Sequence, residues 1–242
     1  MKISVSHNYE ELSSRATADM LESLGGSDRK LVCVASGDSP KGMYRKLTEL
    51  VASGELDISN WDFIGLDEWV GLNEKDEGSC GEFLNEFIVQ PLNLPAERYS
   101  LFDGKAADIY AECRYAELFV DQHGGLDLAI LGLGMNGHLG LNEPGAPLNV
   151  RTLVGQLAPK TIETGQKYFK KPTSLTEGVT LGLAMLLSAK KVYLLVSGEK
   201  KASILKQVVE GEISNAVPGS LLRNHPNCIL FADKPACSLL SL

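Results

Sequence analysis

Short apolar segments alternate with segments of helical periodicity along the whole chain. Four of the apolar segments are each followed by Gly, Ser or Asp, which is typical of buried strands in a parallel sheet; they cover residues 31–35, 63–66, 126–131 and 192–196, and a first core strand is expected at 3–5. Apolar residues recur on one helical face in 43–51, 83–88 and 202–209. The pattern predicts an α/β fold: a doubly wound, mainly parallel sheet flanked by helices, in a single domain over residues 1–242.

The composition excludes several classes of protein. Of the 242 residues, 44% are hydrophobic and 22% are charged, which indicates a folded globular chain rather than a disordered one. The 31 acidic residues outnumber the 23 basic ones and give a net charge of −8, which disfavours binding to nucleic acid or to an anionic membrane surface. A substrate phosphate would therefore need a local binding site.

The cysteines and the N-terminal residues indicate the cellular compartment in which the protein is expected. The five cysteines are odd in number and form no CxxC pair, which predicts buried reduced thiols rather than a disulfide framework or a zinc site: Cys33, Cys80, Cys113, Cys228 and Cys237. Residues 1–7 alternate between polar and apolar and do not resemble a signal peptide, and no apolar run is long enough to span a membrane. We expect a cytoplasmic protein.

Ligands of open α/β sheets bind beyond the carboxyl ends of the strands, so the loops after the four apolar strands are the candidate sites. The first loop runs from Ser36 through Gly37, Asp38 and Ser39 to Pro40. We expect Ser39 as N-cap and Pro40 as first helical residue, which would leave free backbone N–H groups that can hold a phosphate. An ordinary capped turn explains the loop equally well. Asp38 would disfavour an anion unless its carboxylate points away.

Two further loops carry charged residues. In the second, Asp67 and Glu68 are adjacent, so at most one should face a pocket while the other serves as a cap or an ion pair. A carboxyl near the apolar Trp69 could have a raised pKa and act as a general base. In the fourth, Lys200 or Lys201 lies in the first helical turn, where an anionic ligand would explain a lysine better than the helix dipole does. A solvated lysine pair is the ordinary alternative.

The third loop, residues 132–145, is the most unusual. Its five glycines let the backbone approach a ligand closely, and they surround Asn136, His138, Asn142 and Glu143. His138 therefore favours a functional interpretation. The other histidines lie in polar sequence and are expected at the surface: His7, His123 and His225. No spacing of metal ligands occurs, and the first loop, residues 36–40, is neither a Walker loop nor a GxGxxG motif, which disfavours nucleotide binding there.

Taken together, these loops resemble the glucosamine-6-phosphate deaminase family, and look most similar to its galactosamine-6-phosphate deaminase/isomerase branch. The similarity covers almost the whole chain. It includes Ser-Gly-Asp-Ser-Pro at 36–40, Leu-Asp-Glu-Trp-Val at 66–70, Gly-Leu-Gly-Met-Asn-Gly-His at 132–138, Asn-Glu-Pro-Gly at 142–145 and Val-Thr-Leu-Gly at 179–182. The resemblance implies an enzyme that opens the ring of an amino sugar 6-phosphate, moves a proton between C2 and C1, and releases ammonia to leave a ketose 6-phosphate. That family uses no metal or organic cofactor.

The resemblance also implies roles for catalytic residues. By motif position, Asp67 is the base that moves the proton, His138 is the acid/base of ring opening, and Glu143 holds and charges that histidine. Asn136 stands where the deaminases usually have Asp. This departure removes a negative charge beside His138 and leaves Glu143 as its only nearby carboxylate partner. Because Asn also occurs in the galactosamine branch, we interpret it as a marker of that branch.

The substrate-binding residues implied by the resemblance lie in three places. The phosphate is expected in the loop formed by Ser36, Gly37, Asp38 and Ser39, with Lys201 as its lysine. Lys167 stands where an arginine is common and keeps the charge without the bidentate fork. Gly134 and Gly137 would let the backbone approach the sugar. Because both hexamers and monomers occur in the family, the resemblance leaves the formation of a homo-oligomer open.

Two alternatives remain open at this point. A 6-phosphogluconolactonase has a similar fold and histidine loop, but it should carry Asp-Glu-Arg after the second strand and a Ser-Leu-Phe-Pro type continuation after the histidine. Here Trp69 and the segment 142–144 are of the deaminase type. A non-catalytic sugar-phosphate sensor would normally bring a DNA-binding helical module, for which this chain has no room, although Asn136 keeps a degenerate binding protein open.

Overall fold

The polypeptide folds around two sheets. The computed structural model describes residues 1–241 and places seven strands in a parallel sheet of order β1-β10-β9-β6-β2-β3-β5. A second, antiparallel sheet has the order β4-β8-β7. The strands are β1 (Lys2–Ser6), β2 (Lys30–Val34), β3 (Trp61–Gly65), β4 (Asp67–Trp69), β5 (Tyr99–Ser100), β6 (Leu128–Gly132), β7 (Thr152–Gln156), β8 (Glu177–Leu181), β9 (Val192–Val196) and β10 (Cys228–Asp233).

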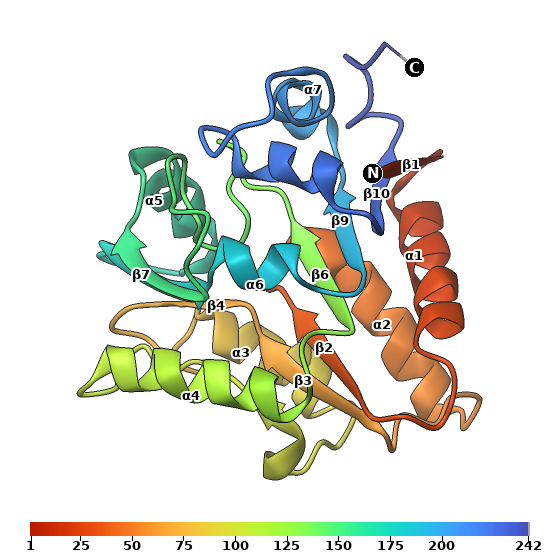
Figure 1. The fold of residues 1–242 in the computed structure, drawn as a ribbon, viewed down its shortest axis with the longest axis vertical. Coiled ribbons are helices and arrows are strands. Elements are labelled where there is room, and N and C mark those ends of the chain that lie inside the picture. Colours follow the sequence, from red (N-terminus) through yellow and green to blue (C-terminus); the bar gives the residue numbers. More distant parts are fainter. Residues whose placement is uncertain (242) are drawn as a thin grey trace.

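Helices cover both faces of the large sheet (Figure 1). They are α1 (Tyr9–Ser23), α2 (Asp38–Ala52), α3 (Cys80–Leu84), α4 (Ile109–Gln122), α5 (Pro159–Gly165), α6 (Leu183–Leu187) and α7 (Ala202–Glu210). The buried side chains of α1 and α2 form one apolar core with alternate residues of the central strands. Those of α4, α6 and α7 form another with the intervening residues. This alternation follows from the two-residue period of a strand, and it confirms the doubly wound, mainly parallel sheet.

The predicted elements are present with shifted ends. Each of the five expected strands overlaps one of β1, β2, β3, β6 and β9. The three amphipathic segments lie in α2, in α3 together with the π-helical turn Asn85–Val89 that follows it, and in α7. One helix start was wrong: α2 begins at Asp38 with Gly37 as its N-cap, rather than at Pro40 with Ser39 as the cap. Gly37 has a φ of 112°, a conformation that glycine adopts without strain and that turns the chain into the helix earlier. No side chain caps this end, so its first N–H groups are available to a ligand.

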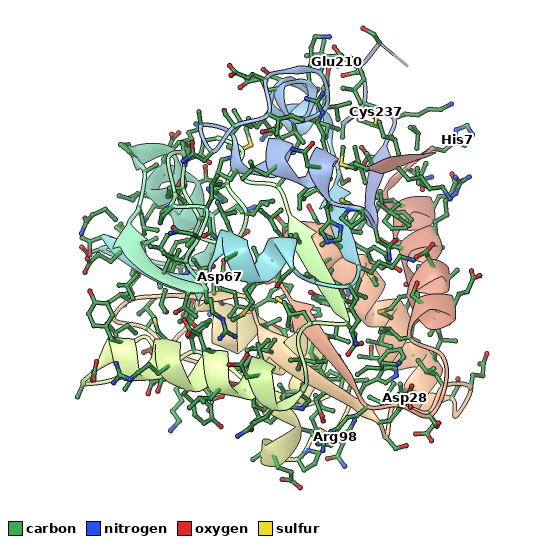
Figure 2. All side chains as sticks on the ribbon, viewed as in Figure 1. His7, Asp28, Asp67, Arg98, Glu210 and Cys237 are labelled. Carbon is green, nitrogen blue, oxygen red and sulfur yellow. The ribbon has the colours of Figure 1, made fainter. Side chains whose placement is uncertain are left out.

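The small sheet is hydrogen-bonded to the end of β3, next to Asp67. Leu66 continues from β3, and its N–H donates to the carbonyl of Val34 at 3.0 Å. Its own carbonyl accepts from the N–H of Leu181 at 2.9 Å, at the end of β8. The next residue, Asp67, begins β4. Asp67 therefore stands where the two sheets meet, near the middle of the molecule (Figure 2).

Candidate active site

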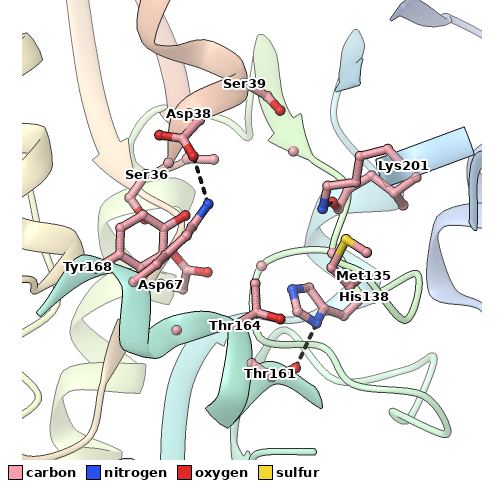
Figure 3. Close-up of a pocket in the computed structure, with 18 of the residues that line it drawn as sticks. Ser36, Asp38, Ser39, Asp67, Met135, His138, Thr161, Thr164, Tyr168 and Lys201 are labelled. Atoms are coloured by element: carbon pink, nitrogen blue, oxygen red, sulfur yellow. Dashed lines mark hydrogen bonds and ion pairs between the residues drawn. The ribbon is translucent and has the colours of Figure 1, made fainter. Parts of the chain in front are cut away.

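The four loops predicted from the sequence surround one cavity of about 920 Å³ at the carboxyl ends of β2, β3, β6 and β9. Residues of α5 and the turn after it form a further wall (Figure 3). All the predicted site residues line this cavity except Asn136, Gly137 and Glu143. The position agrees with the general rule that ligands of doubly wound sheets bind where the strand order reverses, which here is between β2 and β6.

Asp67 lies in the wall of the cavity. Burial raises its pKa to about 6, although the charge of His138 and a hydrogen bond from the Cys80 thiol both act to lower it. A carboxyl with that pKa is ionised at neutral pH and readily reprotonated, which suits a general base. The raised pKa of Asp67 therefore comes from its burial at the junction of the two sheets, and not from a neighbouring carboxylate.

Glu68 points away from the cavity and is fully buried. Its carboxylate accepts hydrogen bonds from the N–H groups of Trp69 at 2.8 Å, Cys80 at 3.0 Å and Gly81 at 2.8 Å. The last two are the first residues of α3, so Glu68 fastens the start of that helix beneath the cavity. This confirms the prediction that only one of the two adjacent carboxylates faces the pocket while the other serves as a cap.

His138 lines the cavity, and two residues support it from behind. Its Nδ1 lies 3.4 Å from Oε2 of Glu143. The Nδ2 group of Asn136 donates to the same Glu143 oxygen at 2.7 Å, while its Oδ1 accepts from the His138 N–H at 3.3 Å. Burial alone would raise the pKa of Glu143, but hydrogen bonds from His138, Thr161 and Asn136 and the charge of His138 outweigh it and lower the pKa to about 2. Glu143 is therefore ionised beside the histidine at any working pH.

The two glycines of this loop serve different purposes. A Cβ atom on Gly134 would lie 2.2 Å from Nε2 of His138, so only glycine leaves room for the ring. Gly137 lies outside the cavity wall; it has a φ of 87°, and a Cβ there would lie 2.7 Å from Cγ1 of Val217. Gly134 therefore clears space for the histidine, whereas the structure gives Gly137 a conformational role rather than a place at the cavity.

Lysines in the wall of the cavity carry its positive charges. Lys201 is partly buried and its ammonium group donates to the carbonyl of Leu133; burial and the nearby charge of Lys167 lower its pKa to about 8. Lys167 forms an ion pair with Asp38, with 2.7 Å between Nζ and Oδ2 (Figure 3). The Asp38 carboxylate is thus turned toward a lysine. Lys200 is exposed at the rim.

Sequence reasoning missed several residues of the cavity wall. Thr161 and Thr164 come from α5, a short helix with no amphipathic signal, and Tyr168 follows it. A Cβ on Gly37 would lie 3.2 Å from the hydroxyl of Tyr168, so this tyrosine closes over the first loop. Cys80 was counted only as a buried thiol. All five cysteines are indeed buried and unpaired.

Two histidines outside the cavity correct the expectation of surface positions. The His123 ring is nearly buried and lies 2.9 Å from Asp62, which also pairs with Arg29 and Arg98. His225 is buried, and its Nε2 lies 2.8 Å from the carbonyl of Ala189. Both sit in polar clusters formed by distant parts of the chain. His7 is exposed beside β1, as expected (Figure 2).

Within residues 1–241, no group of three or more His, Cys, Asp or Glu side chains is arranged to hold a metal ion. Over the same residues, none of the helices combines the length and the apolar character needed to cross a membrane.

Comparison with known proteins agrees with this geometry. A family model described as glucosamine-6-phosphate isomerases/6-phosphogluconolactonase matches residues 5–230. The chain belongs to this family. A glucosamine-6-phosphate deaminase of Thermoanaerobacter pseudethanolicus is 35% identical over 241 residues, covering 99% of this chain and 95% of the relative. One of Clostridium tetani is 38% identical over 244 residues, covering 99% and 100%. The family resemblance inferred from the motifs is therefore confirmed, and the chain is a member of a family of enzymes.

Solved structures extend the comparison. A monomeric glucosamine-6-phosphate deaminase superposes with a TM-score of 0.94 at 34% identity, covering 99% of this chain and 100% of the other. A 6-phosphogluconolactonase from Leishmania guyanensis superposes with a TM-score of 0.81 at 20% identity, covering 100% and 99%. The second likeness shows the shared fold alone. The expected fold type of deaminases and lactonases is thus confirmed.

Proposed function

We propose that the enzyme converts an amino sugar 6-phosphate and water into a ketose 6-phosphate and ammonia. One observation carries this proposal: a single cavity holds a half-buried carboxyl with a pKa of about 6, a histidine backed by an ionised glutamate, and two lysines together with a helix N-terminus. Isomerisation needs a base that takes and returns a proton, ring opening needs an acid/base, and the phosphate needs positive charge.

The reaction divides between the two acid/base groups. His138 would take the proton from the C1 hydroxyl and give one to the ring oxygen, which breaks the ring and forms the aldehyde. Asp67 would then remove the C2 proton while the C1 oxygen takes up a proton, which gives an enolamine. It would return its proton at C1 as the amino nitrogen loses one, leaving an imine at C2. Water adds to that imine and ammonia leaves. Family membership supports this assignment, because relatives at 34–38% identity over the whole chain are named glucosamine-6-phosphate deaminase.

The phosphate would bind at the free N–H groups of α2 in the loop 36–39, with Lys201 and Lys167 as counter-charges. All three features line the same cavity. In this arrangement Lys167 exchanges its partner Asp38 for a substrate oxygen. Ser36 and Ser39 add hydroxyl donors at the same place.

Of the two sugars, we propose galactosamine 6-phosphate as the preferred substrate and glucosamine 6-phosphate as the next. Asn136 supports the galacto sugar, because it occupies the position that marks that branch in the family resemblance. The names of the relatives favour the gluco sugar instead. The two sugars differ in one hydroxyl at C4, so the comparison of their kinetics decides between them.

Ammonia release measured with both sugars tests the proposal. We expect release with either sugar and a higher kcat/KM with galactosamine 6-phosphate. A higher value with glucosamine 6-phosphate would overturn the branch assignment alone. Hydrolysis of 6-phosphogluconolactone without ammonia release from either sugar would establish the lactonase instead, and binding without any turnover would establish a sensor.

The pH profile is expected to be bell-shaped. Below about pH 6 the Asp67 carboxyl becomes protonated, so kcat/KM should fall about tenfold per pH unit. Above about pH 8 the Lys201 ammonium loses its charge, so KM should rise. Lys201→Arg supplies the control, because a guanidinium keeps its charge and should move the alkaline limb upward. An alkaline limb that does not move in this variant would exclude Lys201 as its source.

Asp38→Asn is expected to lower KM by about two- to fivefold, the size measured for exposed ion pairs. The change frees Lys167 and removes a negative charge from the phosphate end of the cavity. Asp121→Asn is the matched control, since it removes an exposed ion pair with Arg151 and neither residue lines the cavity. A rise in KM for Asp38→Asn would show instead that Asp38 positions Lys167.

A further inference from the structure

The first turn of α5 is fastened to the histidine–glutamate pair. The N–H of Ala158, the N-cap of α5, donates to Oε1 of Glu143 at 3.1 Å. The hydroxyl oxygen of Thr161, one turn further, lies 3.1 Å from Nδ1 of His138 (Figure 3). Thr161 is almost fully buried and lines the cavity. The helix that forms one wall of the cavity therefore also contacts the proposed ring-opening group.

We propose that Thr161 is a positioning residue, whose hydroxyl accepts from Nδ1–H of His138 and fixes the tautomer of the histidine for ring opening. The inference rests on the proposed function. A hydroxyl can accept from Nδ1–H, because its oxygen carries lone pairs and its own proton can rotate away from the ring. The direct separation of 3.4 Å between Nδ1 and Oε2 of Glu143 is longer than the usual length of an N–H···O hydrogen bond, so the Thr161 hydroxyl, at 3.1 Å, is the closer partner of Nδ1.

The consequence concerns the other ring nitrogen. With the proton held on Nδ1, Nε2 carries the lone pair and is the atom that can take the proton of the C1 hydroxyl. Nε2 belongs to the part of the ring that lies against Gly134, and both residues line the cavity. The proton then passes to the ring oxygen as the bond from C1 to that oxygen breaks. One proton moves from one oxygen to another, and no oxidant or further reactant is needed.

The same contact couples the wall of the cavity to the histidine. Thr164 on α5 and Lys167 and Tyr168 in the turn after it line the cavity toward the first loop. A movement of α5 would therefore change the support of His138 at one end and the ion pair of Lys167 with Asp38 at the other. The histidine is fully supported only while α5 occupies this position.

Three variants test the role. Thr161→Val keeps the shape and removes the hydroxyl, Thr161→Ser keeps the hydroxyl, and Thr152→Val removes a hydroxyl that bonds Glu117 outside the cavity. We expect kcat for ammonia release to fall about tenfold or more in Thr161→Val, which is part of the roughly 10²–10⁴-fold that a positioned acid/base contributes in all, with KM changed less than about twofold. Thr161→Ser should recover most of kcat, and Thr152→Val should match the wild type. The melting temperature of each variant is measured alongside.

A second readout does not depend on turnover. Nitrogen chemical shifts of the His138 ring report its tautomer by NMR. We expect the wild type to carry the proton on Nδ1 and Thr161→Val to lose this preference. Wild-type kcat in Thr161→Val, or identical ring shifts in the two proteins, would overturn the inference. Absence of ammonia release from the wild type would instead refute the proposed function and leave the NMR comparison as the test of the hydroxyl link.

Discussion

Asp67→Asn should abolish deamination while making the fold more stable at neutral pH. The amide has nearly the same shape as the carboxyl but cannot take the C2 proton, so kcat should fall by at least about 100-fold, the lower end of what a general base contributes. Ammonia release under saturating substrate measures this loss. Asp28→Asn, at an exposed position, serves as the control.

The gain in stability follows from the direction of the pKa shift. Burial raises the pKa of Asp67 from 3.8 to about 6 in the folded state, so between these values the unfolded chain releases a proton that the folded protein keeps. Stability then falls as the pH rises through this window, and the loss is complete above about pH 6. Asp67→Asn lacks this loss. Its melting temperature should exceed that of the wild type at pH 8, and the difference should close near pH 4.

An Asp67→Asn protein that still releases ammonia at the wild-type rate would remove Asp67 from the mechanism. Equal melting temperatures at pH 8 would contradict the half-buried, ionised carboxyl independently of the activity.

Gly134→Ala should lower kcat by a similar factor, because the added methyl group displaces the His138 ring. The added methyl group would lie 2.2 Å from both Nε2 and Cδ2 of His138, far inside contact distance, so the ring must move. The N–H of Gly134 also donates to the carbonyl of His138 at 3.0 Å, which keeps the two residues together and prevents an easy shift of the turn. We expect kcat to fall about 100-fold or more.

The matched control for this change is Gly155→Ala on β7. A Cβ there would lie 3.7 Å from Leu153, which is an ordinary contact, and Gly155 lies outside the cavity. Its kinetics should match the wild type. Wild-type kcat in Gly134→Ala would mean that the His138 ring has room to move without loss, and would argue against its proposed role.

The buried strands could be predicted because their signal is local. The apolar segments that became β2, β3, β6 and β9 need no partner to be recognised. The small sheet could not be found in this way. Its strand β4 has only three residues, and β7 is half-exposed and alternates weakly, so both depend on pairing with β8 more than 20 residues away in sequence.

The same distinction holds for the site. Asp67, His138 and Lys201 could be located because each follows a predicted strand, and parallel strands bring their carboxyl ends to one edge. Thr161 and Tyr168 could not, because they reach the cavity through a segment whose position is set by tertiary contacts. His123 and His225 were misplaced for the same reason: their partners, Asp62 and the carbonyl of Ala189, are distant in the sequence.

Turnover of amino sugar 6-phosphates deuterated at C2 tests the central claim most directly. The account predicts one ammonia for each ketose 6-phosphate formed, a slower reaction than with the protonated sugar, and deuterium at C1 of part of the product, because Asp67 carries the proton from C2 to C1. Asp67→Asn should show none of these. Failure to form ammonia and ketose from either sugar, or a ketose 6-phosphate that carries no deuterium at C1, would contradict the account.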